Sequence, residues 1–188
     1  QHNKHIARSD IGPRISYKRS FMKEVLWNRN YIYVCAANFL LFFSFYLLLP
    51  LLPFYLRDTF AADKQTIGII LSGYTITALA IRPFGGFIVD SFPRKQVLLI
   101  SYFAFFAFFA GYLITGTLLM FAIIRAAHGL TFGAVTVANS TMAIDVLAPS
   151  RRAEGIGYYG VSNNLAMAIG PSLSMYMYDH HIATEYIF

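Results

Sequence analysis

Long apolar segments without charged residues constrain this chain more than any other feature. From Tyr31 to Leu56 there are 26 consecutive positions without Asp, Glu, Lys or Arg. About 20 apolar residues are enough for a helix to cross the hydrocarbon core of a bilayer. Comparable, mostly apolar segments follow at about 66–89, 96–114, 118–143 and 155–178, and another begins near Glu185. We therefore expect an all-α membrane protein, with about five transmembrane helices and the start of a sixth.

The composition supports a membrane protein and argues against nucleic-acid binding. Only 13% of the residues are charged, against about 25% in soluble domains, and 57% are hydrophobic. The net charge of +6 comes from cations in the N-terminal region and in the turns, which do not form one basic face. Cys35 is the only cysteine, so the sequence offers no disulfide and no paired-cysteine metal site.

The N-terminal region, residues 1–30, is polar and basic and precedes the transmembrane bundle, residues 31–188. A signal peptide is not expected, because the apolar segment that follows is too long and lacks a small-residue cleavage site. Met22 could be a natural start, which would make residues 1–21 an extension. We expect a solvated arm held at an anionic membrane surface.

The distribution of cations predicts the orientation in the membrane. If the helices alternate in direction, 11 Lys and Arg residues lie on the side of the N-terminus and 2 on the other side. The excess of cations in cytoplasmic loops then places the N-terminus in the cytoplasm. The expected location is the plasma membrane, which in a bacterium is the inner membrane.

Three ionisable residues lie inside the apolar segments. Arg82 is about two turns from the end of the second segment, where its side chain could either extend to the interface or serve a function. Arg125 lies about 12 Å from the nearest turn, too deep for that escape, so we expect a polar role inside the bundle. His128, one turn further, could relay protons or be hydrogen-bonded within the bundle.

Small residues and a proline predict close helix contacts and a hinge. Gly129 and Gly133 are spaced so that two helix backbones can approach closely. Gly170 and Pro171 interrupt the fifth segment, because proline removes one backbone hydrogen bond. The aromatic third segment, with Phe105 and Phe109 among its rings, is expected to face lipid or pack at the periphery.

Three partial motifs, in order, carry a family resemblance. The turn between the second and third segments reads GFIVDSFPRK, in which Gly86, Asp90, Arg94 and Lys95 match a known loop signature, whereas Ser91 and Pro93 depart from it. The fourth segment carries Arg125 followed by Gly129, and the fifth carries Gly157, Gly170 and Pro171 in a pattern typical of antiporters. Over residues 22–188 the chain resembles the N-terminal half of a major facilitator superfamily transporter.

The resemblance implies a twelve-helix bundle of two six-helix halves that rock around a central cavity, the C-terminal half lying outside this chain. It implies that the turn is a gating element. Asp90 would cap a helix of the other half, a contact worth about 0.3–2 kcal/mol. Arg94 would pair with Asp145 of the fourth segment.

The same resemblance favours proton-coupled efflux, with a small solute and protons as partners alongside the lipid bilayer. No Asp or Glu lies deep inside the five segments, so a coupling acid would belong to the other half, or His128 would substitute. A cavity that contains an arginine and several amides, but no acid, suits neutral or anionic solutes better than cations. Polarity and depth suggest these residues for the cavity of this half: Asn38, Tyr46, Tyr74, Arg125, Asn139, Asn163 and Asn164.

Other functions remain as alternatives. A transporter of the same fold could import a nutrient or facilitate its diffusion, and a membrane receptor or scaffold would not transport at all. An enzyme is not expected, because His180 and His181 are adjacent on a loop and make a poor metal site without further ligands. We expect no catalytic residue, metal or cofactor.

Overall fold

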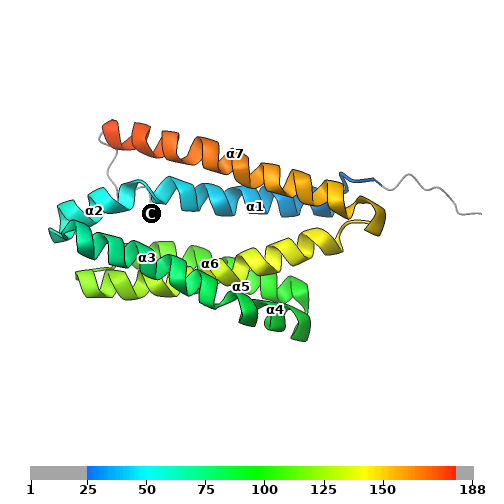
Figure 1. Ribbon diagram of the computed structural model, residues 1–188, viewed down its shortest axis with the longest axis horizontal. Coiled ribbons are helices and arrows are strands. Elements are labelled where there is room, and N and C mark those ends of the chain that lie inside the picture. The colour runs from blue at the N-terminus through cyan, green and yellow to red at the C-terminus, as the bar shows by residue number, and fades with distance from the viewer. Residues whose placement is uncertain (1–24, 181–188) are drawn as a thin grey trace, which may run out of the picture.

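The structure is a computed structural model that describes residues 25–180. Residues 1–24, most of the expected N-terminal arm, and the expected sixth helix near Glu185 lie outside the described residues. Within the described part, the chain forms α-helices that run side by side (Figure 1). They are α1 (Arg29–Leu48), α2 (Leu51–Phe60), α3 (Lys64–Ala80), α4 (Arg82–Ser91), α5 (Arg94–Leu113), α6 (Leu118–Asp145) and α7 (Arg152–Asp179), with a short 3-10 helix (Pro149–Arg151) before α7.

Side-chain caps fix where three of the long helices begin. Asn28 accepts a hydrogen bond from the backbone N–H of Tyr31 at 2.9 Å, and so caps α1. Asp63 caps α3 and Thr117 caps α6 in the same way. Each cap satisfies one of the backbone donors that have no partner inside the helix.

Two of the expected continuous helices are divided, which corrects the sequence-based boundaries. The first segment, expected at 31–56, consists of α1 and α2, with Pro50 between them. The second, expected at 66–89, runs from Lys64 to Ser91 and is interrupted at Ile81. Pro83 explains this break, because it has no N–H to continue the hydrogen-bond ladder.

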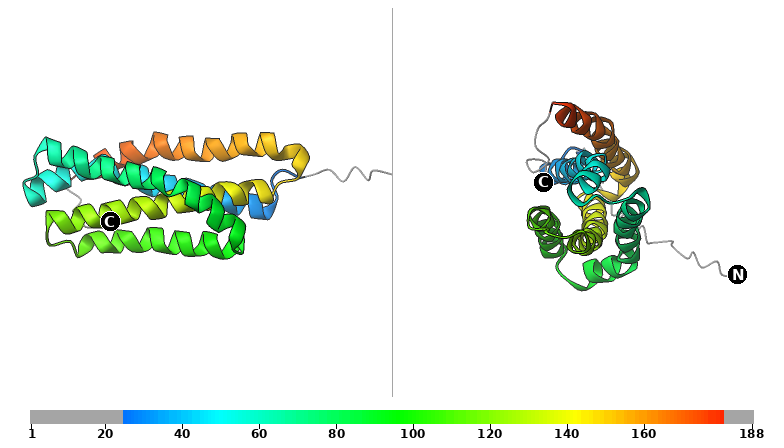
Figure 2. Two further views of the ribbon diagram at one scale, coloured as in Figure 1. Left: turned by 60° about the horizontal axis from the view of Figure 1, so that its bottom comes forward. Right: turned by 90° about the vertical axis from the view of Figure 1, so that its left-hand side faces the viewer.

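Helix α6 lies at the centre of the bundle. It packs along α3 and α5 and contacts α4, α1 and α7, whereas α7 packs mainly along α1 (Figure 2). The bundle therefore consists of an α1–α7 pair and an α3–α5–α6 trio, with α6 in contact with both. This arrangement places the polar residues of α6 at two different helix interfaces.

Four helical stretches in the described part are long and apolar enough to cross a membrane: Arg29–Leu48, Lys64–Ser91, Arg94–Leu113 and Leu118–Asp145. Helix α7 has 28 residues, as many as α6, but is not among these four stretches. Its sequence includes Asn163, Asn164 and several serines and glycines, which lower its hydropathy.

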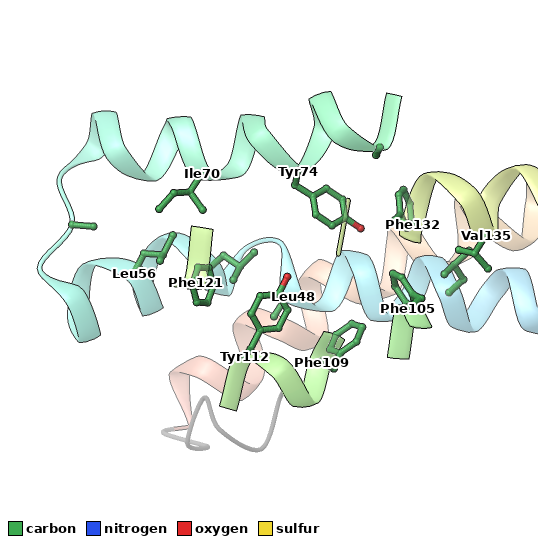
Figure 3. Close-up of a cluster of buried hydrophobic side chains, with 14 residues drawn as sticks. Leu48, Leu56, Ile70, Tyr74, Phe105, Phe109, Tyr112, Phe121, Phe132 and Val135 are labelled. Atoms are coloured by element: carbon green, nitrogen blue, oxygen red, sulfur yellow. The ribbon is translucent and has the colours of Figure 1, made fainter. Parts of the chain in front are cut away.

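Aromatic side chains fill the core of the trio, and α5 packs at its periphery against α6. Phe105 and Phe109 are buried against α6, together with Tyr112 of the same helix (Figure 3). Helix α5 therefore does not merely face lipid. Only one of its faces is outward, where Phe103 is 78% exposed.

Candidate functional site

The closest helix contact in the described part joins α3 and α6 at two glycines. A methyl group on Gly129 would collide with the carbonyl oxygen of Tyr74, and one on Gly133 with that of Ala78. Thr77 also donates a hydrogen bond across the interface to the carbonyl oxygen of Ala126, at 2.8 Å. Small residues thus allow the two backbones to approach, as the sequence predicted.

Next to this contact lies the buried arginine cluster, formed by Tyr74 of α3, Tyr112 of α5, and Arg125 and His128 of α6. Arg125 and His128 are each only 1% exposed. Arg125 Nη1 donates to Tyr112 Oη at 3.1 Å, and its Cζ lies 3.9 Å from the centroid of the Tyr74 ring. The Arg125 charge is therefore stabilised by a phenol oxygen and an aromatic face rather than by a carboxylate.

The hydroxyl of Tyr112 links the two polar residues of α6 in the buried arginine cluster. Tyr112 Oη accepts from Arg125 Nη1 at 3.1 Å and lies 2.8 Å from His128 Nδ1. Phe105 and Phe109 pack against the imidazole with ring centroids 4.6 and 5.0 Å away. This geometry favours the hydrogen-bonded interpretation of His128 over a proton relay.

Further along α6, toward its C-terminal end, lies an open cleft of about 320 Å³. It is formed by α1, α4, α6 and α7, and α5 does not contribute to it. We use the name open cleft for the space between these residues: Asn38, Phe42, Arg82, Thr136, Val137, Ser140, Tyr159, Gly160 and Asn163.

Amide side chains hold the inner wall of the open cleft together. Asn38 Nδ2 donates to Ser162 Oγ at 2.8 Å, and Asn139 Nδ2 donates to Asn38 Oδ1 at 3.3 Å and to Tyr159 Oη at 3.0 Å. Asn38 and Asn139 are fully buried. These bonds link α1, α6 and α7, so the position of the wall depends on side-chain pairing.

At one end of the bundle lies the gate end, which we define as Asp90, Arg94 and Asp145. Arg94 forms an ion pair with Asp145 of α6 and lies 3.5 Å from Asp90, one turn before it. The predicted pair of Arg94 and Asp145 is therefore present. The Asp90 side chain is 73% exposed and available to a further partner, and Lys95 beside it is exposed.

The structure separates the residues that the sequence assigned to one cavity. Asn38, Asn139 and Asn163 lie at the open cleft, whereas Tyr74 and Arg125 belong to the buried arginine cluster. Tyr46 packs against Phe42 and Phe45. Asn164 is exposed and lies in neither group.

The glycines of the motifs differ in their surroundings. A methyl group on Gly170, beside Pro171 in α7, would lie 2.8 Å from Tyr46 Cβ, so this glycine permits the approach of α1. Gly157 and Gly86 have no neighbour within 4 Å of such a group. The packing role expected for Gly157 is therefore not supported in the described part of the chain.

Two residues with clear roles were missed by the sequence reasoning. Tyr112 bridges Arg125 and His128, and its spacing from Phe105 and Phe109 places all three on one face of a helix, a signal that could have revealed it. Tyr159 caps the amide wall of the cleft, but nothing in its sequence context distinguishes it from Tyr158.

Within residues 25–180 no group of three or more His, Cys, Asp or Glu side chains is arranged to hold a metal ion. The open cleft offers a guanidinium and hydrogen-bonding groups to a bound molecule. The buried arginine cluster is a closed polar core. The carboxylates of this part of the chain lie at or near helix ends.

Known proteins resemble this chain over most of its length. It is 27% identical over 151 residues to the quinolone resistance protein NorA of Staphylococcus aureus, which covers 78% of this chain and 38% of that protein. It is 24% identical over 139 residues to the uncharacterized transporter YqjV of Bacillus subtilis, which covers 74% of this chain and 34% of that protein. The chain thus spans less than two fifths of the length of these relatives.

A comparison with protein families gives a match over most of the chain. The model of the Major Facilitator Superfamily, whose members are membrane transporters rather than enzymes, matches residues 34–188. That match includes the helices that form the buried arginine cluster, the open cleft and the gate end. This chain therefore belongs to the Major Facilitator Superfamily.

Proposed function

We propose that the chain is the N-terminal half of a secondary-active transporter that exports a small solute by alternating access in exchange for protons. The gate end carries this proposal: an exposed Asp90 stands beside an ion pair that joins α5 to α6. A carboxylate in that position can bind the N-terminus of a helix from a second half and release it when the halves rock. The similarity to a quinolone resistance protein supports export.

The proposal includes an orientation and a division of labour. The gate end and the N-terminus face the cytoplasm, because most cations flank that side. The open cleft forms this half's wall of the transport path. The coupling carboxylate is assigned to the second half, since the described interior of this chain carries none.

Transport in inverted membrane vesicles that contain the intact protein tests direction and coupling. With a fluorescent quinolone as probe, energised inverted vesicles should accumulate it, and a protonophore should abolish the accumulation. Accumulation only in vesicles of the opposite orientation would instead support an importer, the alternative with the same fold.

The gating role is tested by Asp90→Asn, which should reduce transport strongly while membrane insertion stays normal. Asp58→Asn is the matched control, since Asp58 is also exposed but lies in α2, where it pairs with Arg57. Wild-type transport rates in Asp90→Asn would refute the proposed gating role of Asp90.

A further inference from the structure

We propose that the open cleft binds organic anions and that Arg82 determines this charge preference. The inference rests on the proposed transport function, because it names the class of solute that this half of the path would hold. It assigns to Arg82 a role in specificity. The sequence alone did not decide whether this side chain extends to the membrane interface or serves a function.

The first argument is charge. Arg82 lies in the wall of the cleft, and within residues 25–180 it has neither a hydrogen-bonding nor an ion-pairing partner. The carboxylates of that part are elsewhere, since none of the side chains that line the cleft is Asp or Glu. A cation within a membrane-spanning segment, without a counterion and facing a cavity, attracts an anion more strongly than the same cation in water.

The second argument concerns which guanidinium can reach a solute. Arg125 is buried between Tyr74 and Tyr112, so a solute in the cleft cannot contact it. Arg82 is exposed and presents a planar fork of N–H donors that matches a carboxylate or another oxyanion.

The third argument comes from the remaining groups of the cleft. Thr136 donates to the carbonyl oxygen of Gly133 and Ser140 to that of Val137, both within α6, so these hydroxyls present lone pairs to the cleft. They can accept from an N–H or O–H of a solute but supply no donor to an anion. Tyr159 and Asn163 also line the cleft and carry neutral donors, so Arg82 is the one cation of the lining that can pair with the anionic end.

The apolar side of the cleft defines the rest of the solute. Phe42 and Val137 are the large apolar side chains of its lining. A volume of about 320 Å³ lies at the lower end of the range for small-molecule sites. The expected solute is a small organic anion with an aromatic or aliphatic body, rather than an inorganic ion.

Binding to the purified intact protein tests the inference with three probes of one shape: 2-naphthoate, neutral 2-naphthamide and cationic 2-naphthamidine. The wild type should bind the naphthoate more tightly than the amidine. Arg82→Gln should weaken naphthoate binding about 10- to 100-fold, as expected for the loss of a charge-assisted hydrogen bond, and leave naphthamide binding unchanged. Arg82→Lys should retain part of the preference, and Lys64→Gln, at an exposed position of α3, should retain all of it.

Three outcomes would overturn the inference. They are absence of naphthoate binding by the wild type, a preference for the amidine, and an equal loss for all three probes in Arg82→Gln. An equal loss with a lower unfolding temperature would mean that Arg82 pairs with a carboxylate of the second half. The proposed function can fail while the inference holds. If anion binding depends on Arg82 but the protein shows no proton-driven export, the transport mechanism is refuted and the binding site is not.

Discussion

Two arginines lie inside membrane-spanning helices of this protein, and their surroundings differ in nearly every respect. Arg125 is enclosed by the trio, where it donates to Tyr112 and lies against the face of the Tyr74 ring. Arg82 lies at the break between α3 and α4, exposed and without a partner in the described chain. Depth in the membrane therefore does not decide what an arginine does. The neighbouring helices do, because Arg125 of α6 is enclosed by α3 and α5, whereas Arg82 of α4 borders the open cleft.

The largest expected effect compares these two arginines directly. Arg125→Ala should destabilise the protein by about 3 kcal/mol or more, because it empties the volume of a large buried side chain and removes a partner of Tyr112. Arg82→Ala should change stability by less than about 0.5 kcal/mol, as expected for an exposed side chain. Thermal unfolding in detergent measures both. Equal losses would contradict the contrast.

A further variant separates volume from charge at the buried site. Arg125→Met fills most of the space without a charge and should recover much of the stability lost in Arg125→Ala, since buried charges are often no more stabilising than well-packed apolar groups. If Arg125→Met is as unstable as Arg125→Ala, the guanidinium itself holds the trio together.

A smaller loss is expected where the trio is closed by the α3–α6 contact. Gly133→Ala should cost about 1–3 kcal/mol, because its methyl group meets the carbonyl oxygen of Ala78 and the helices must separate. Gly157→Ala is the control, since its methyl group would enter open space. An unchanged unfolding temperature in Gly133→Ala would show that the two helices are not in close contact.

The hydroxyl of Tyr112 should contribute about 1–3 kcal/mol. Tyr112→Phe keeps the ring but removes a hydrogen-bond partner from both Arg125 and His128, which are buried. Tyr33→Phe is the control, because its hydroxyl bonds to Arg29 at the exposed surface. Equal stability of the two variants would show that the polar core tolerates unpaired groups.

The smallest effect is a pH dependence outside both arginine sites. Hydrogen bonds from Thr66 hold the pKa of Asp63 below its usual 3.8. Because the folded-state pKa is lowered, the cap stabilises α3 above pH 3.8, and this contribution is lost as the pH falls through the folded-state value. Asp63→Asn can still cap and should remove this acid dependence, which unfolding temperatures between pH 5 and 3 would reveal.

The sequence predicted much of the fold because the apolar segments are long and the turns carry the charges. The pairing of Arg94 with Asp145 was implied by the family resemblance, and the structure contains it. The sequence predicted a buried polar role for Arg125 from its depth but left Arg82 undecided, because the direction in which a helix face points depends on its neighbours. Tyr112, which bridges Arg125 and His128, was missed although its spacing from Phe105 and Phe109 places the three rings on one helix face.

The amide wall of the cleft has a mechanical consequence. The α1–α7 pair meets the trio through the Asn38–Asn139 hydrogen bond and the stacked rings of Phe45 and Phe132, 4.9 Å apart. Rings can slide over each other at little cost, and an amide pair can exchange partners within one step of that slide. A displacement of the pair along this seam would widen or narrow the cleft while the glycine contact between α3 and α6 stayed shut. In such a displacement the α1–α7 pair would act as a movable wall of the open cleft.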